Sequence, residues 1–193
     1  MTNHKAVCPL GMGMITIKSS GQGQPKRGDP PLEFFALYKT DKKTPVVSPF
    51  DDKGRLLPNV VYATGEFEYN YETDFKGRIE KFSTDNLQLT EREVRVPHEA
   101  STPGKSDGDH AGHLAGDRFG GSPKLDNLVS QSSTVNLSSY KKLENTWAKA
   151  IENGKTVTVD VDVIYAKDGL RPIAFEVSYT IDGPPKITEI LKN

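Results

Sequence analysis

The stretch Ser138–Tyr165, SSYKKLENTWAKAIENGKTVTVDVDVIY, decides the fold class because a helical period in it gives way to a strand period. In its first half the large apolar residues recur every three or four positions, at Tyr140, Leu143, Trp147 and Ile151. This spacing predicts an amphipathic helix. Ser138 or Ser139 would cap its start, and Gly154 would end it.

Strand periodicity is found on both sides of this helix. Valine takes every second position in 157–163, and Ile173–Asp182 alternates in the same way after the turn KDGLRP. Lys186–Leu191 predicts a further edge strand. Upstream, alternating aromatic residues, the turn TDFKG and the segment RIEKF together predict a hairpin over residues 65–82. The order of strands, loop, helix and strands predicts an α+β fold with a mainly antiparallel sheet.

The chain divides by composition near residue 60. Residues 1–31 are rich in Gly, Pro, Lys and Ser, and Leu32–Tyr38 (LEFFALY) would form a short strand or one helical segment. We therefore expect an N-terminal extension or linker over 1–60 and the functional domain over 61–193. Within that domain, the composition of Pro97–Gly112 predicts a loop.

Composition excludes several classes of protein. The net charge of −1 over 193 residues provides no global basic field for tight, static DNA binding. The single cysteine, Cys8, excludes an internal disulfide framework, and its place in the least structured segment disfavours a catalytic thiol. The apolar runs are far shorter than the roughly 20 residues of a membrane span, and no signal-peptide core is recognisable. We expect export, if it occurs, by another route or within a longer polypeptide.

The segment Asp107–Gly121, DGDHAGHLAGDRFGG, combines ionisable side chains with glycine. It is either a surface loop or a site where backbone must approach a ligand closely. A neutral imidazole is the commonest general base near pH 7, so His113 is the candidate to take a proton from water. The alternative interpretation is that His113 is a surface or structural histidine. On the functional interpretation, Gly112 would let a phosphodiester backbone approach the base.

Asn136 and Glu144 lie eight residues apart, before the predicted helix and in its second turn. An amide oxygen with waters suits Mg²⁺, which accepts few protein ligands, and Glu144 would orient one of those waters. The structural alternative is that Asn136 caps the helix and Glu144 pairs with Lys141 or Lys149.

Two other site types are less well supported. His110 and His113 have H-x-x-H spacing, and zinc oxygen ligands would come from flanking aspartates, Asp109 or Asp117. Zinc usually needs three or four protein ligands, and the remaining histidines are distant in sequence, at His4 and His98. The glycine-rich segment matches neither a P-loop nor a dinucleotide fingerprint.

Three segments together resemble the DNA/RNA non-specific endonucleases: GDHAGHLAGDRFGG, Leu125–Tyr165 and Arg171–Gly183. Within that family, the resemblance is to the branch found as C-terminal toxin domains of bacterial polymorphic toxins and secreted effectors. It covers residues 62–183, with the motifs in the family's order. The resemblance implies the ββα-metal nuclease fold, in which a hairpin and a helix grip one divalent cation against an antiparallel sheet.

The resemblance also implies roles for three residues. His113 falls on the general base that ends the family motif D-R-G-H or D-x-G-H. Asn136 falls on the metal-binding asparagine, and Glu144 on the helical glutamate eight residues later. The implied cofactor is Mg²⁺ or another divalent cation such as Mn²⁺.

The chain departs from the family pattern at two positions. His110 stands where the family has the aspartate of its tetrapeptide, so either His110 or the preceding Asp109 would take over its supporting role. Leu137 stands where the family has an arginine. Arg118 would replace that phosphate contact and clamp a non-bridging oxygen. Alternatively, Arg118 pairs with an acidic neighbour, Asp117 or Asp126.

The leading hypothesis is metal-dependent hydrolysis of DNA, with RNA as a second candidate substrate and with little sequence preference. The resemblance implies an antibacterial effector delivered into the target-cell cytoplasm in interbacterial competition, a cognate immunity protein, and no membrane partner. One alternative is a catalytically degenerate nucleic-acid-binding module on the same fold. Another is an adaptor or delivery domain, for which the Gly/Pro-rich first 60 residues would be suited.

Overall fold

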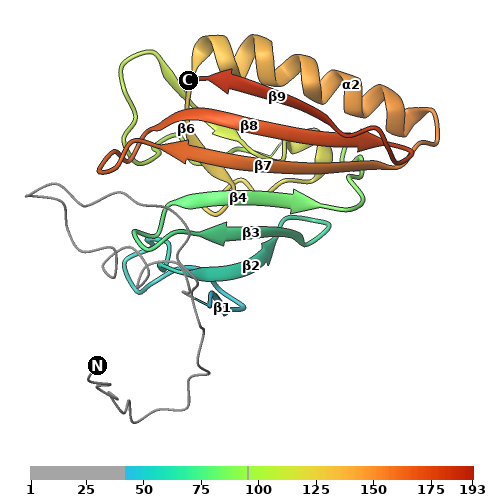
Figure 1. Ribbon diagram of the computed structural model, residues 1–193. Helices are drawn as coiled ribbons and strands as arrows, with labels where there is room; N and C mark the ends of the chain where they lie inside the picture. The colour runs from blue at the N-terminus through green and yellow to red at the C-terminus, as the bar shows by residue number, and fades with distance from the viewer. Residues whose placement is uncertain (1–41, 95) are drawn as a thin grey trace, which may run out of the picture. The chain divides into compact units, whose positions relative to one another are not determined.

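A computed structural model of the chain describes residues 42–94 and 96–193 (Figure 1). The predicted element Leu32–Tyr38 lies outside the described residues, as do Cys8 and His4. One compact unit spans Asp41–Asn193. Its first strand, Thr44–Pro45, pairs with the strand Val60–Thr64, so these two residues of the expected extension belong to the same sheet as the expected domain.

Seven strands of the described chain form one sheet in the order β1-β2-β3-β4-β7-β8-β9 (Figure 1). Their bounds are β1 Thr44–Pro45, β2 Val60–Thr64, β3 Tyr69–Thr73, β4 Ile79–Thr84, β7 Val157–Tyr165, β8 Pro172–Ile181 and β9 Ile187–Lys192. Every neighbouring pair is antiparallel except β1–β2, which is parallel. The predicted α+β class with a mainly antiparallel sheet is confirmed.

The predicted hairpin is the pair β3–β4. Its turn is stabilised by Asp74, whose Oδ1 accepts hydrogen bonds from the backbone N–H groups of Lys76 and Arg78 at 2.8 and 3.0 Å. The first strand begins at Tyr69 rather than at Phe67, the first of the alternating aromatic residues, because Glu68 has a positive φ of 52° and still belongs to the preceding turn.

A second, two-stranded sheet pairs β5, Asp109–His113, with β6, Leu128–Ser132. The loop prediction over 97–112 is therefore wrong from Asp109 onward, and β6 was not predicted. Histidine and glycine in β5 conceal its strand character. The strand forms because β6, with its first four residues buried, offers a complete antiparallel partner in the register His113↔Leu128.

The predicted helix is confirmed as α2, Tyr140–Glu152, and it continues a π-helical turn, η2, Val135–Ser139. The capping prediction for Ser138 or Ser139 is wrong: Ser139 already has helical angles and makes no side-chain cap. Gly154 does end the helix, with φ of 73°. Among residues 42–94 and 96–193, no helix has both the length and the apolar character to cross a bilayer.

One face of α2 packs on the sheet through a chain of aromatic edge contacts. The Trp147 ring lies 5.8 Å from Tyr179 of β8 and 6.1 Å from Tyr140, measured between centroids. Tyr140 in turn contacts Phe175 and donates a hydrogen bond from its hydroxyl to the carbonyl of Leu114 at 2.7 Å. Tyr140 thus connects the first turn of α2 both to the main sheet and to Leu114, the residue that follows β5.

Asn127 holds the glycine-rich segment 114–122 onto the main sheet. Its side chain is fully buried and makes four hydrogen bonds. Oδ1 accepts from the Tyr71 hydroxyl at 2.7 Å and from the Ala115 N–H at 2.9 Å. Nδ2 donates to the carbonyls of Ala115 and Ser122 at 2.9 and 2.8 Å. One amide thus fixes β3 and both ends of this segment together.

Replacing Asn127 with alanine is expected to lower the free energy of unfolding by about 2–4 kcal/mol, because several buried donors and acceptors lose their partner at once. Urea unfolding of the two proteins measures the difference. Asn86 is exposed, and Asn86→Ala is the matched control, expected to stay within about 0.5 kcal/mol of the parent. Equal midpoints for both variants would contradict this assignment.

Candidate active site

A cleft of about 390 Å³ brings together three separate segments: the loop before β5, β5 itself and the π-helical turn η2. Its lining residues are His98, Ala100, Lys105, Asp109, His110, Ala111, His113, Asn136 and Leu137. The hairpin and the helix start therefore place two predicted functional residues, His113 and Asn136, on one cavity.

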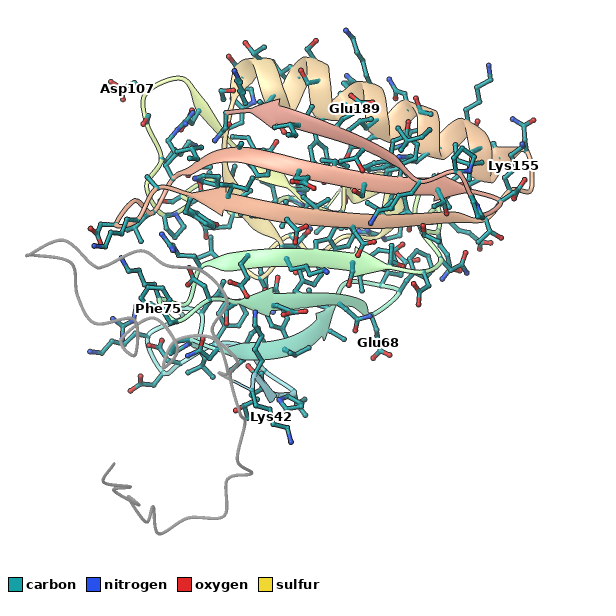
Figure 2. All side chains as sticks on the ribbon, in the orientation of Figure 1. Lys42, Glu68, Phe75, Asp107, Lys155 and Glu189 are labelled. Atoms are coloured by element: carbon teal, nitrogen blue, oxygen red, sulfur yellow. The ribbon has the colours of Figure 1, made fainter. Side chains whose placement is uncertain are left out.

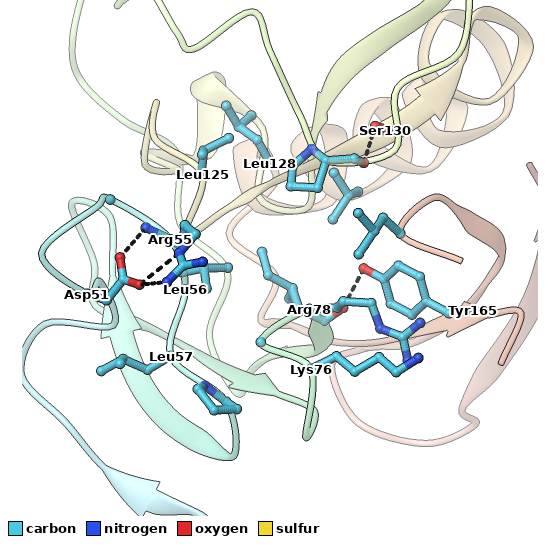
Figure 3. A pocket seen from close by; sticks show the side chains of 17 residues that line it. Asp51, Arg55, Leu56, Leu57, Lys76, Arg78, Leu125, Leu128, Ser130 and Tyr165 are labelled. Carbon is cyan, nitrogen blue, oxygen red and sulfur yellow. Dashed lines mark hydrogen bonds and ion pairs between the residues drawn. The ribbon is translucent and has the colours of Figure 1, made fainter. Parts of the chain in front are cut away.

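A second cavity of about 410 Å³ lies between β6, the β3–β4 turn and the loop before β2 (Figure 3). Five leucines line it, and its cations Arg55, Lys76 and Arg78 are already paired with carboxylates. Arg55 lies 2.8 Å from Asp51, and Arg78 hydrogen-bonds Asp74 and stacks on Tyr165. The chemistry expected of a catalytic site is therefore found in the first cleft.

His113 is the last residue of β5 and is half-buried. Its imidazole meets that of His98 edge to face, with ring centroids 4.9 Å apart and the planes at 63°. The backbone carbonyl of His113 accepts a hydrogen bond from Gln131 Nε2 at 3.4 Å. The ring is thus held between a paired strand and a second histidine from the preceding loop.

Asn136 lies inside η2, and its Nδ2 is 3.0 Å from His110 Nδ1. The interpretation of Asn136 as a helix cap is wrong, because no side-chain cap is made at either helix start. An amide nitrogen donates, so the contact runs from Asn136 Nδ2 to the His110 ring. The contact commits the nitrogen end of the amide and leaves the oxygen end for a cation. Single π-turns of this kind are common at functional sites.

Glu144 lies on α2 and its carboxylate abuts the backbone of Gly116. A Cβ on Gly116 would lie 2.2 Å from Glu144 Oε1, so only glycine admits the carboxylate in this position. Burial, and secondly the charge of Glu144, raises the pKa of Tyr140 well above its usual value. The carboxylate therefore approaches the segment after His113 from the helix side.

The role expected for the glycines is corrected by their surroundings. A Cβ on Gly112 would meet the Gln131 side chain at 2.3 Å, and one on Gly121 would meet the Ala115 carbonyl oxygen at 1.8 Å. The space next to each of these glycines is filled by other atoms of the protein and is not open to a substrate. The glycine content of this segment reflects close internal packing around the site.

Asp109 is anchored by Arg171, at the start of β8. The guanidinium makes two hydrogen bonds to the carboxylate, Nε–Oδ2 at 2.7 Å and Nη2–Oδ1 at 2.8 Å, and the Ser106 N–H adds a third at 3.0 Å. These bonds, with Arg171 the largest cause, lower the pKa of Asp109. Asp109 therefore ties β5 to the main sheet, and the residue that supports Asn136 is His110.

Asp109→Asn is expected to destabilise the protein by about 1–3 kcal/mol at pH 7, because a buried charge-assisted pair is lost. The folded pKa lies below the ordinary 3.8, so the pair stabilises above that value and its contribution falls as the pH drops through and below it. Urea unfolding at pH 7 and at lower pH measures this. The difference in the free energy of unfolding between Asp109→Asn and wild type is expected to shrink at low pH. Asp85 is exposed, and Asp85→Asn is expected to show no comparable difference at either pH.

Arg118 is not brought to the cleft. It lies exposed on the short helix η1, Asp117–Phe119, and its Nη1 donates to Asn145 Oδ1 on α2 at 2.9 Å. Asp117 and Asp126, the alternative partners, interact instead with other side chains. The geometry therefore gives no support to Arg118 as the group that contacts the phosphate.

Two cleft residues were not predicted as functional, His98 and Lys105. Both come from the loop before β5, where composition indicates only a loop, and His98 was considered only as a distant histidine. In the structure the His98 ring contacts the His113 ring. No local sequence pattern predicts this contact, because the two residues are far apart in the sequence. Despite this gathering of histidines, no group of three or more His, Cys, Asp or Glu suited to a metal occurs among residues 42–94 and 96–193.

Comparison with known proteins identifies the family of the chain. The model of the DNA/RNA non-specific endonuclease family matches residues 58–183. The type VII secretion system protein EssD of Staphylococcus aureus, strains USA300 and NCTC 8325, is 37% identical over 146 residues, covering 71% of this chain and 24% of each relative. EssD of strain Newman matches equally well, with 23% of its length covered. The chain thus spans about a quarter of the curated relatives it matches. Because the family model matches more than half of the chain, the chain belongs to the DNA/RNA non-specific endonucleases, a family of nucleases.

Proposed function

We propose that the chain cleaves phosphodiester bonds of DNA, and of RNA as a second substrate, with little sequence preference and with a divalent cation. The observation that carries the proposal is the convergence of His113 and Asn136 on one cleft, in a chain of this family. Contacts to a phosphate backbone carry no sequence information, so a cleft of this kind acts on many sequences.

The residues present suit a hard divalent cation. The Asn136 amide oxygen would hold it, and the Glu144 carboxylate would hold one of its waters. Mg²⁺ prefers oxygen donors and retains several waters, and Mn²⁺ accepts the same set. When bound, the cation stabilises charge on the phosphoryl group and on the leaving oxygen.

His113 acts as the general base. Its neutral imidazole takes a proton from a water whose oxygen attacks the phosphorus, and the bond from phosphorus to the 3′ oxygen breaks in line. The edge contact with His98 restricts the orientation of the His113 ring. A base held in one orientation loses little entropy when the substrate arrives.

His110 orients Asn136 in the place of the aspartate found in the family pattern. His110→Ala is expected to reduce activity about tenfold and to raise the Mg²⁺ concentration for half-maximal activity, since the amide loses its support. His110→Asp is the matched variant: its carboxylate still accepts from Asn136 Nδ2, so activity stays close to wild type. Plasmid cleavage rates against Mg²⁺ concentration measure both. Equal losses in the two variants would contradict this role.

The biological role is proposed from the relatives. EssD is by name a protein of a type VII secretion system. We place this chain as the toxic domain of a secreted effector that acts in the cytoplasm of a target cell during competition between bacteria. A producing cell then needs a cognate immunity protein, and the cleft is the surface that such an inhibitor would cover.

Digestion of supercoiled plasmid and of RNA by the purified protein tests the function. We expect degradation with Mg²⁺ or Mn²⁺ and none with EDTA. Degradation of both substrates would show that the sugar is not discriminated. Intact substrates in every lane, together with a gel shift, would show that the protein binds nucleic acid without cleaving it. The chain would then be a catalytically degenerate binding module, and Leu137 at the arginine position would explain the loss of activity.

A further inference from the structure

Lys105 brings an uncompensated positive charge to the cleft. It is exposed and lines the same cavity as His113 and Asn136. The carboxylate of that cavity, Asp109, is already neutralised by Arg171. Within residues 42–94 and 96–193, no ion pair includes Lys105. Among the residues that line the cleft, Lys105 therefore carries a positive charge that no carboxylate of the described residues pairs with, although the whole chain carries a charge of −1.

The turn that carries Lys105 is fixed to the β5–β6 hairpin by buried hydrogen bonds. The Thr102 hydroxyl lies 2.7 Å from that of Ser130 on β6, and Ser130 Oγ donates to the Pro103 carbonyl at 2.9 Å. The Lys105 N–H closes the turn on the Thr102 carbonyl at 3.3 Å. Gly104 has φ of 72°, which lets the turn lie against the backbone of Arg171. In Figure 2, Asp107 marks the loop that follows this turn and leads into β5.

The side-chain ammonium group of Lys105 is held in place, as is the backbone of the residue. Lys105 Nζ donates one hydrogen bond to the Ala100 carbonyl at 2.7 Å, and Ala100 lines the same cleft. A lysine has three donors, so the others are available to an anion in the cavity. Holding the side chain in this way reduces the rotamer entropy that phosphate binding would otherwise cost.

We infer that Lys105 is the residue of the cleft that binds the phosphate backbone of the nucleic acid. This inference rests on the proposed function. A charge-assisted hydrogen bond from Nζ to a non-bridging oxygen supplies the contact that Arg118 does not make and that Leu137 has no group to make. As a point charge on the backbone, Lys105 contributes affinity and position without reading the base.

The test is the salt dependence of binding to a fluorescent DNA duplex, measured by anisotropy in EDTA with the His113→Ala protein, which leaves the substrate uncut. Adding Lys105→Gln is expected to reduce the slope of log affinity against log salt by about 0.9, one phosphate contact. Affinity at 0.1 M salt then falls roughly 5–10-fold. Lys105→Arg keeps the slope. The matched control Lys53→Gln removes another exposed positive charge, outside the cleft, and is expected to leave the slope unchanged.

The outcomes separate this inference from the proposed function. An unchanged slope in Lys105→Gln, from a protein whose wild type cleaves DNA, overturns the inference alone. A wild type that binds but never cleaves overturns the proposed activity, while a slope reduced only by Lys105→Gln still supports the phosphate contact. Absence of binding at every salt concentration overturns both. Equal slope losses in Lys105→Gln and Lys53→Gln indicate a diffuse charge effect and also overturn the inference.

Discussion

His113→Ala is expected to lower the rate of phosphodiester hydrolysis by about 10²–10⁴-fold, the usual contribution of a positioned general base. Binding of nucleic acid is expected to change little, because the proposed phosphate contact of Lys105 does not depend on His113. The expected loss follows from the place of His113 at the end of β5, on the same cleft as Asn136. His110 is not expected to replace it, because His110 Nδ1 is engaged with Asn136.

The measurement is the initial rate of plasmid nicking at saturating Mg²⁺, together with duplex binding in EDTA. His113→Gln accompanies the alanine variant, since it retains a polar side chain of similar reach without a base. Thermal unfolding shows whether either variant changes the fold. A rate within tenfold of wild type for both His113 variants would show that His113 is not the general base. A loss of binding equal to the loss of rate would show that His113 contacts the substrate instead.

Gly116→Ala is expected to reduce activity by about 100-fold, the upper part of the range for groups that support a metal site. Gly116 has φ of −60° and ψ of 158°, angles that alanine adopts without strain. The effect therefore arises from the new Cβ alone, which would lie 2.2 Å from Glu144 Oε1 and displace the carboxylate. Overpacking of this kind costs about 1–3 kcal/mol of stability, so the protein still folds.

A double-mutant cycle with Glu144→Ala is the measurement for Gly116. If the alanine acts through Glu144, the double variant loses no more activity than Glu144→Ala alone. The Mg²⁺ requirement is expected to rise in all three variants, because the Glu144 carboxylate proposed to orient a metal-bound water is displaced in Gly116→Ala and absent from the other two. Gly169→Ala is the matched control, since its Cβ would meet nothing closer than 3.6 Å. Additive losses in the cycle would show that Gly116 acts independently of Glu144.

Most of the main sheet and the long helix were predictable from local periodicity. Alternation marks β7 and β8 because one face of each is buried, and the spacing of Tyr140, Leu143 and Trp147 marks α2 for the same reason. The β5–β6 hairpin was not predictable in this way. Each of its strands is five residues long, β5 contains two histidines and a glycine, and the partners are separated by the segment 114–127.

The candidate site residues were predicted where a motif carries them. His113, Asn136 and Glu144 were predicted from their order and spacing together with the family resemblance, and the structure places His113 and Asn136 on one cleft. The partners of the supporting residues were not predictable: Asp109 is bound by Arg171, 62 positions away, and Arg118 by Asn145. Ion pairs of long sequence separation leave no periodic signal, and a charged residue in a loop has many equivalent partners until the chain is folded.

The sequence by itself determined the fold class, the helix, the family and the order of the motifs, because these depend on local periods and on short segments that keep their spacing. Only the tertiary structure decided that His98 contacts His113, that His110 holds Asn136, and that Lys105 rather than Arg118 faces the cleft. Each of these is a contact between segments that folding brings together. Their free energy comes from packing and hydrogen bonds that exist only after the hairpin, the π-turn and the sheet have been assembled.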